Sequence, residues 1–213
     1  MINITETHDL CTITIDDGRA NALNFESVDA LSQAIEKHST TSQALILKGR
    51  PGIFCAGLDL AVVRSGDEAR LRQLLDLAEG LYRLMLSSPV PIVAACTGHA
   101  LAGGALMLLC CDYRIGLRGD FRIGFNEVAI GMPLPRFGSD VARARLSRGR
   151  FIRATVLAET TGPDEAVTVG FLDEVHDAAV TEAAARKATA LVALPRDAYA
   201  AGKQIAYRSV HTQ

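Results

Sequence analysis

The chain has 213 residues, of which 49% are hydrophobic, so it can bury the core of one globular domain. A formal net charge of −2 provides no basic surplus for a nucleic acid or an anionic membrane, which favours a small-molecule or protein partner. The longest apolar run, residues 100–111, is much shorter than the roughly 20 residues that cross a bilayer. No basic or apolar leader follows Met1, and we therefore expect a cytoplasmic protein.

The five cysteines lie mostly in apolar segments, and none forms a Cys-x-x-Cys pair. This pattern indicates small buried thiols rather than disulfides. We expect no metal site, because no cluster of cysteine and histidine has the spacing of metal ligands.

The N-terminal part predicts the order strand, strand, helix, strand. Residues 2–7 and 10–15 alternate polar and apolar side chains, as a hairpin with one solvated face does. A helix can then begin at Asn24 or Ser27, since either side chain can cap it. Residues 44–47 follow as a short buried strand.

The middle of the chain alternates apolar segments with glycine- and proline-rich breaks. Residues 49–57 predict a loop, residues 67–87 a helix and residues 91–96 a buried strand. The chain turns at Thr97-Gly98, and a buried helix begins at the glycine pair Gly103-Gly104.

The pattern changes in the second half of the chain. Residues 113–117 and 121–123 predict two short strands, after which we expect the sheet to end. From residue 136 onward the spacing of apolar residues is helical. We therefore expect an α/β core over residues 1–135 and a helical region over residues 136–213, both in the same domain unit.

Two glycine turns that follow strand-like segments are candidates for an oxyanion site. They are residues 55–59 and residues 102–105. The first N–H groups of a helix have no intrahelical partner, and glycine allows a ligand to approach the backbone closely. One such turn alone is weak evidence, because glycine after a strand is more often plain turn geometry.

Glu127 is a candidate general base. Apolar residues flank it, and a partly desolvated carboxylate has a raised pKa that suits it to accept a proton. The alternative is a capped, solvated glutamate at the N-terminus of a helix.

Several segments together resemble the crotonase (enoyl-CoA hydratase/isomerase) superfamily. They are residues 50–60, 98–106, 111–115 and 124–127, together with Asn21-Ala-Leu-Asn24. Their order and spacing agree over roughly residues 1–175, and the first and third are most like those of Δ3,Δ2-enoyl-CoA isomerases. The resemblance implies an α/β fold of repeated strand–strand–helix turns with a helical C-terminal region. It also implies an acyl-CoA substrate, with coenzyme A as part of the substrate and no other cofactor.

The resemblance also assigns roles to individual residues. It places the two oxyanion-hole donors on the backbone N–H groups of Leu58 and Gly103, and the acid–base role on Glu127. The substrate-binding positions that it implies are Arg19, Ala20, Ala22, Ala56, Gly57, Asp59 and Leu60, with Gly104 and Leu106 on the helix. His99 stands where the family varies and is given no role.

One departure from the family pattern decides between hydration and isomerisation. Family hydratases use two glutamates, and the position of the first is occupied here by Leu106. Leu106 lies about one helical turn beyond Gly103, so it should face the same site. Two positioned carboxylates add water well and one does so poorly, whereas moving a proton from C2 to C4 requires one base, and an apolar wall excludes water. We therefore favour an isomerase.

Two alternatives stay open. One is another crotonase reaction, namely enoyl-CoA hydration, thioester hydrolysis or decarboxylation. The other is a CoA-binding member of the family without catalysis. The resemblance further implies a homotrimer or a dimer of trimers, and we expect the alanine-rich C-terminal helices to pack on a neighbouring copy.

Overall fold

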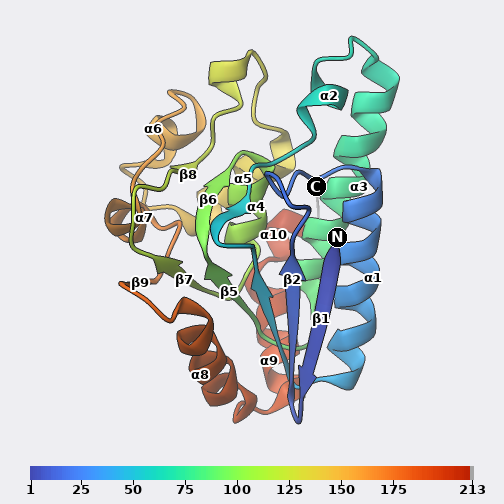
Figure 1. The fold of residues 1–213 in the computed structure, drawn as a ribbon, viewed down its shortest axis with the longest axis vertical. Coiled ribbons are helices and arrows are strands. Elements are labelled where there is room, and N and C mark those ends of the chain that lie inside the picture. The colour runs from blue at the N-terminus through green and yellow to red at the C-terminus, as the bar shows by residue number, and fades with distance from the viewer. Residues whose placement is uncertain (212–213) are drawn as a thin grey trace.

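The computed structural model of the chain describes residues 1–211, which form two sheets surrounded by helices (Figure 1). The larger sheet has the strand order β1-β2-β3-β5-β7-β9, and the smaller has the order β4-β6-β8. The strands are β1 (Ile2–Thr7), β2 (Leu10–Ile15), β3 (Ala44–Lys48), β4 (Gly52–Cys55), β5 (Ile92–Cys96), β6 (Gly98–Leu101), β7 (Tyr113–Leu117), β8 (Ile123–Gly124) and β9 (Glu174–His176). The helices are α1 (Phe25–Thr41), α2 (Leu60–Val63), α3 (Glu68–Ser87), α4 (Gly103–Leu109), α5 (Arg136–Arg145), α6 (Phe151–Thr155), α7 (Pro163–Val169), α8 (Val180–Val192), α9 (Arg196–Ala206) and α10 (Arg208–His211).

Successive turns of the chain contribute one strand to each sheet. β3 and β4 separate into the larger and the smaller sheet, and β5 and β6, then β7 and β8, do the same. Apart from the antiparallel hairpin of β1 and β2, the strands of both sheets pair in parallel. The predicted fold class, stacked strand–strand–helix turns, is confirmed.

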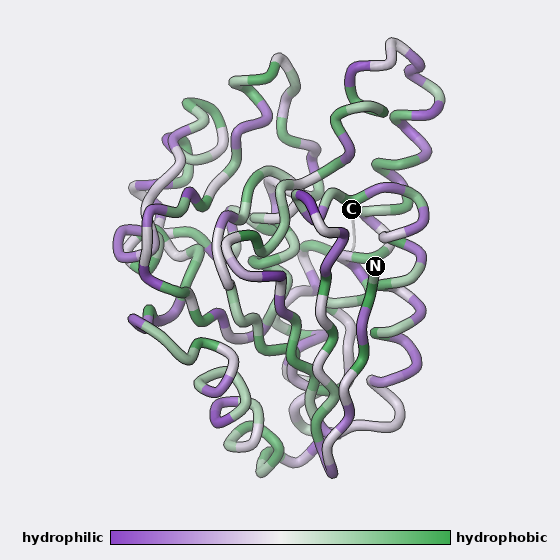
Figure 2. The backbone as a smooth tube through the Cα atoms, viewed as in Figure 1, coloured by the Kyte–Doolittle hydropathy of each residue, from purple (hydrophilic) through white to green (hydrophobic). Residues whose placement is uncertain are grey.

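Both residues that could cap α1 act together. The Asn24 side chain accepts a hydrogen bond from the Ser27 backbone N–H at 2.8 Å, and the Ser27 hydroxyl accepts one from the Asn24 backbone N–H at 2.9 Å. This reciprocal cap satisfies two backbone donors and fixes where the helix begins. In Figure 2, α1 alternates hydrophilic and hydrophobic residues, as expected of a helix with one face against the core.

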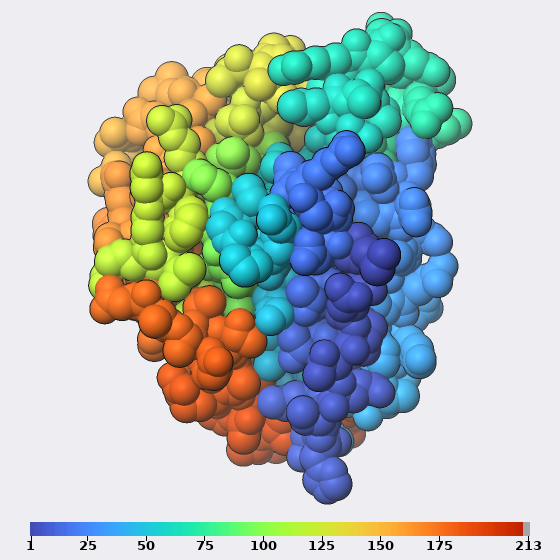
Figure 3. Space-filling model, viewed as in Figure 1, coloured from blue at the N-terminus to red at the C-terminus, as the bar shows by residue number. Residues whose placement is uncertain are grey.

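The central strands β3, β5 and β7 of the larger sheet are buried on both faces, because α8 covers the face opposite α1 and α3, whereas the edge strand β1 is largely exposed. Along β5, Ile92 and Ala94 point into the main core, whereas Val93 and Ala95 point into a second core that α8 completes. In the space-filling view the orange C-terminal segment lies directly against the blue N-terminal strands (Figure 3). α8 thus packs its apolar face on the sheet of its own chain, and the expectation that the C-terminal helices pack on a neighbouring copy stays a prediction.

The sequence predicted that the sheet ends near residue 123, but the larger sheet has one more strand beyond it. β9 pairs with β7 at its edge, so the C-terminal region contains a strand as well as helices. An ion pair holds the segment before β9 against β7, because a guanidinium nitrogen of Arg114 lies 2.8 Å from a carboxylate oxygen of Asp173. The same guanidinium donates a hydrogen bond to the Gly170 carbonyl. Residues 212 and 213 of the predicted helical region lie outside the described residues.

Two segments that the sequence predicts as loop and turn supply two of the three strands of the smaller sheet. β4 lies within residues 49–57, and β6 begins directly after Thr97. A methyl group at Gly98 would come within 2.0 Å of the Gly52 backbone, so the pairing of β4 with β6 requires glycine there. No helix within residues 1–211 is long and apolar enough to cross a membrane.

Candidate active site

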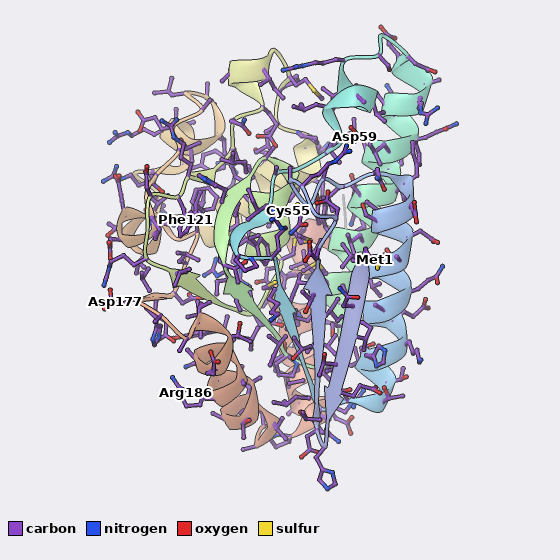
Figure 4. All side chains as sticks on the ribbon, viewed as in Figure 1. Met1, Cys55, Asp59, Phe121, Asp177 and Arg186 are labelled. Atoms are coloured by element: carbon purple, nitrogen blue, oxygen red, sulfur yellow. The ribbon has the colours of Figure 1, made fainter. Side chains whose placement is uncertain are left out.

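The two glycine turns meet at the ends of β4 and β6. These strands are parallel neighbours, so their carboxyl ends lie at the same edge of the smaller sheet. Gly57 has φ +90, and a methyl group there would come within 2.8 Å of the Ala102 Cβ and 3.0 Å of the Gly103 nitrogen. Figure 4 labels Cys55 and Asp59 on the segment that leads from β4 to α2. Only glycine at residue 57 allows the two turns to approach this closely.

The backbone N–H groups of Leu58 and Gly103 have no hydrogen-bond partner within residues 1–211. The residues on either side of Leu58 are bonded: the Leu23 N–H donates to the Gly57 carbonyl at 2.8 Å, and the Asp59 N–H donates to the Leu23 carbonyl at 3.0 Å. Gly103 is the first residue of α4, where an N–H has no intrahelical acceptor. Two unpaired donors on adjoining turns are suited to bind a carbonyl oxygen that gains negative charge.

Ala102, which precedes Gly103, has a strained backbone. Its φ of 49° and ψ of −126° lie in a sparsely populated region for a residue with a Cβ, which costs about 1–3 kcal/mol. Two hydrogen bonds hold it there: the Ala102 N–H donates to the Gly124 carbonyl at 3.0 Å, and the Ala102 carbonyl accepts from Leu106 at 3.0 Å. The peptide that carries the Gly103 N–H is therefore fixed by its surroundings.

α4 itself is buried along its whole length. A methyl group at Gly104 would come within 2.1 Å of the Cys55 carbonyl oxygen, so this glycine serves the packing of the helix on β4. At the other end, the Arg145 guanidinium donates to the Leu109 carbonyl at 3.0 Å and also to the Cys111 carbonyl. A cation at this end satisfies carbonyls that the helix leaves unpaired.

A cavity of about 570 Å³ opens beside the two turns, between α3, α4 and the segment that follows Glu127. Its wall is mostly apolar. Half of the predicted site residues line it, namely Ala56, Leu58, Leu60, Gly103, Leu106 and Glu127. The cavity therefore combines the two unpaired donors with a carboxylate and an apolar lining.

Glu127 is buried in this wall, with 8% of its surface exposed. It precedes the 3₁₀ turn Val128–Ile130, but its side chain makes no capping hydrogen bond, and its Oε2 atom has no partner within residues 1–211. Burial raises the pKa of this carboxyl to about 7, although nearby backbone N–H groups partly offset the effect. The structure thus favours the desolvated carboxylate over the capped, solvated one.

Three further carboxylates reach the cavity from α3, but their environments differ from that of Glu127. Glu68 and Asp76 are exposed, and Glu79 forms an ion pair with Arg83 at 2.7 Å. Opposite them, Leu106 is buried, and a methyl group on Gly138 would come within 3.3 Å of its Cδ2 atom. Of the carboxylates on the described wall, Glu127 alone is buried.

The other predicted substrate-contact residues lie outside the cavity wall. The segment with Arg19 and Ala20 is held against the first turn, because the Ala56 N–H donates to the Ala20 carbonyl at 3.1 Å. Asp59 caps α2 by accepting a hydrogen bond from the Ala61 N–H at 2.8 Å. The complete set outside the wall is Arg19, Ala20, Ala22, Gly57, Asp59 and Gly104.

Sequence reasoning missed the wall that α3 provides. Leu71, Leu75, Ala78 and Tyr82 face the cavity, at spacings that also suit a helix packed on a core. The cavity-facing residues overlap the core-facing ones, since Ala78 and Tyr82 also belong to the core, so periodicity alone did not reveal the cavity. Within residues 1–211, no group of three or more metal-ligating side chains could hold a metal ion.

The sequence profile of the enoyl-CoA hydratase/isomerase family matches residues 5–213. The chain belongs to this family. The assignment confirms the resemblance to the crotonase superfamily, and relatives named as isomerases are among the family members that the chain resembles.

Three relatives illustrate the range of the enoyl-CoA hydratase/isomerase family. Mouse mitochondrial enoyl-CoA delta isomerase 1 is 31% identical over 159 residues, which are 73% of this chain and 55% of that protein, so the match spans little more than half of this curated relative. The probable enoyl-CoA hydratase EchA3 of Mycobacterium tuberculosis is 34% identical with a TM-score of 0.94, over 98% of this chain and 89% of that one. Human mitochondrial delta3-delta2-enoyl-CoA isomerase is 26% identical with a TM-score of 0.93, over 98% of this chain and 84% of that one. Both hydratases and isomerases share the fold, so the reaction must be argued from the site.

Proposed function

We propose that the protein is a Δ3,Δ2-enoyl-CoA isomerase, which moves a double bond through a thioester enolate. The observation that carries the proposal is the single buried carboxylate, Glu127, in a cavity wall where Leu106 stands one helical turn beyond Gly103. One base that both accepts and returns a proton is sufficient for isomerisation, and an apolar neighbour discourages water addition.

In the proposed mechanism, the thioester oxygen accepts hydrogen bonds from the N–H groups of Leu58 and Gly103. The Glu127 carboxylate removes a proton from C2, and the electron pair of that C–H bond moves toward the thioester, which becomes an enolate. The protonated Glu127 then delivers the same proton to C4, while the double bond forms between C2 and C3. No atom is gained or lost, and the product is a conjugated 2-enoyl thioester.

The electrostatics of the site support each step of this mechanism. The two donors are fixed before the reaction begins, so they stabilise the enolate oxygen without reorganisation, and losing one such donor typically costs about 3–4 kcal/mol. Glu127 has a pKa of about 7, so it is partly ionised at neutral pH and its conjugate acid is strong enough to return the proton. We propose that the acyl chain occupies the apolar cavity and that coenzyme A extends along the segment with Arg19, Ala20 and Ala22.

The proposal can be tested by product analysis. We expect 3-hexenoyl-CoA and its longer homologues to yield the conjugated 2-enoyl-CoA, followed by ultraviolet absorbance and by chromatography. Hydration would instead yield 3-hydroxyacyl-CoA, and thioester hydrolysis would release free coenzyme A. If either of these is the main product, the assigned reaction is wrong. Binding of acyl-CoA with no product of any kind would support the non-catalytic alternative.

A further inference from the structure

Tyr82 connects α3 to the proposed oxyanion hole. It is buried, and its hydroxyl donates a hydrogen bond to the Gly103 carbonyl at 2.9 Å. A methyl group at Gly103 would come within 2.8 Å of the Tyr82 oxygen, so the hydroxyl lies directly against the Gly103 Cα. Tyr82 also lines the cavity. Its single O–H group is therefore placed on the residue whose N–H faces the substrate.

This hydrogen bond completes a set that holds Ala102 and Gly103 on both sides of the peptide that joins them. The Ala102 N–H donates to Gly124, the Ala102 carbonyl accepts from Leu106, and the Gly103 carbonyl accepts from Tyr82. The Gly103 N–H is the one polar group of these two residues that has no partner within residues 1–211. Because Ala102 is strained, its conformation depends on such contacts to persist.

The ring of Tyr82 is held as firmly as its hydroxyl. It stacks on the ring of Phe137, with ring centroids 6.3 Å apart and planes inclined by 9°. The Arg83 guanidinium lies over the ring of Phe137. Burial raises the pKa of the Tyr82 hydroxyl well above its ordinary value, so the group keeps its hydrogen throughout the pH range in which Glu127 titrates. Loss of the hydroxyl alone would leave the stacked ring in place.

We propose that Tyr82 is a positioning residue, whose hydroxyl fixes the Gly103 N–H in the direction of the thioester oxygen. This inference rests on the proposed function, since it assigns a purpose to the oxyanion hole of that reaction. Tyr82 acts through Gly103 and takes no part in proton transfer. Its contribution should therefore appear in the step that places charge on the thioester oxygen and not in substrate binding.

The variant Tyr82→Phe tests the proposal, with Tyr207→Phe as the matched control. Tyr207 is also buried but lies outside the cavity wall, with its ring under Arg145. We expect Tyr82→Phe to lower kcat about tenfold, as loss of one orienting hydrogen bond does, with KM changed less than about twofold. Tyr207→Phe should leave both constants unchanged.

A second measurement requires no turnover. Bound octanoyl-CoA, labelled with ¹³C at its thioester carbonyl, should show a lowered carbonyl stretching frequency in the parent. Tyr82→Phe should return this frequency toward its value in solution, and Tyr207→Phe should not. If the parent isomerises no enoyl-CoA, the proposed function fails, but the carbonyl frequency still tests the role of Tyr82.

Four results would overturn the inference. The first is a Tyr82→Phe variant with the kcat and carbonyl frequency of the parent. The second is an equal effect of both tyrosine substitutions. The third is failure of Tyr82→Phe to fold, because it would show that the hydroxyl serves the core. The fourth is a parent in which the carbonyl stretching frequency of bound octanoyl-CoA is not lowered, because the Gly103 N–H would then not polarise the thioester oxygen.

Discussion

Glu127 meets two opposing physical demands. Its burial in an apolar wall brings its pKa to about 7, which suits a base that works near neutral pH. The same burial disfavours the ionised form that catalysis requires, and backbone N–H groups offset this cost only in part, since the Oε2 atom has no partner within residues 1–211. A residue retained under such a cost is typical of a functional site rather than of a structural one.

Replacing Glu127 by glutamine should separate binding from chemistry. Glutamine keeps the shape of the side chain but cannot accept the C2 proton, so we expect kcat to fall by about 10²–10⁴. The affinity for a saturated acyl-CoA, measured by calorimetry, should change little. Glu68→Gln is the matched control, since Glu68 lies on the same wall but is exposed. An equal loss of activity in both variants would contradict the assignment.

The pKa of Glu127 also predicts how activity and stability depend on pH. The carboxylate is the base, so kcat should rise with pH through a midpoint near 7. Stability should change in the opposite direction: the folded-state pKa is raised from 4.5, so the contribution of Glu127 is fully present below pH 4.5 and is lost as pH rises through 7.

Urea unfolding at pH 5 and pH 8 measures this second effect. We expect the parent to lose up to about 3 kcal/mol relative to Glu127→Gln between the two pH values, since one pKa unit corresponds to about 1.4 kcal/mol. The comparison with the glutamine variant removes the contributions of the other titrating groups. A difference that does not change with pH would show that Glu127 is not desolvated.

At the scale of elements, the pairing of β4 with β6 places the two donors side by side. Glycine is needed at three contacts around this pair, at Gly98 against Gly52, at Gly57 against Ala102 and at Gly104 against Cys55. In each case a methyl group would come within 3.0 Å of the neighbouring segment. The approach of the two turns is therefore set by backbone packing.

Gly57→Ala should disrupt this geometry, whereas Gly52→Ala should not. Both glycines have positive φ, +90 and +85, so both substitutions introduce the same kind of backbone strain. They differ in their surroundings, since a methyl group at Gly52 meets nothing within 4 Å. We expect a larger loss of thermal stability for Gly57→Ala, because its methyl group also clashes with the second turn, and a fall in kcat of at least about tenfold for this variant alone. Equal kcat values for the two variants would show that the approach of the turns is not important.

The elements that could be predicted from sequence are those that local pattern determines. The hairpin of β1 and β2, the cap at Asn24 and the length of α3 follow from periodicity and capping within a few residues. β9 and β4 could not be predicted in this way, because each is a short strand that is stable only through pairing with a distant segment. The packing of α8 could not be predicted either, because it depends on the second face of a sheet that forms only when distant strands pair.

The candidate site was predictable only in part, for a related reason. The two turns and Glu127 carry a family pattern that can be read along the chain. Tyr82 could not be identified, because an apolar stripe on a helix looks the same whether it faces a core or a cavity. Gly104 is predicted to contact the substrate, and its close approach to Cys55 adds a packing role that the sequence did not indicate.

At the scale of the whole molecule, the surface carries several exposed apolar residues besides the apolar face that α8 buries on the sheet. Ile152 and Val156 lie one helical turn apart at α6, and Leu157 follows them; each of these residues is more than half exposed. Exposed apolar groups that cluster in this way are typical of protein–protein contacts.

We therefore keep the prediction of a homotrimer or a dimer of trimers. Light scattering at micromolar concentration should give a mass about three or six times that of the 22.7 kDa chain. A mass equal to one chain at every concentration tested would contradict it.

The central claim is that one buried carboxylate beside a leucine moves a double bond but does not add water. The measurement that tests it most directly is a comparison of two rates in the parent protein, the isomerisation of a 3-enoyl-CoA and the hydration of the 2-enoyl-CoA of the same chain length. We predict that isomerisation is faster by at least about 10²-fold, since hydration lacks the second acid–base group. A hydration rate that equals or exceeds the isomerisation rate would contradict the account.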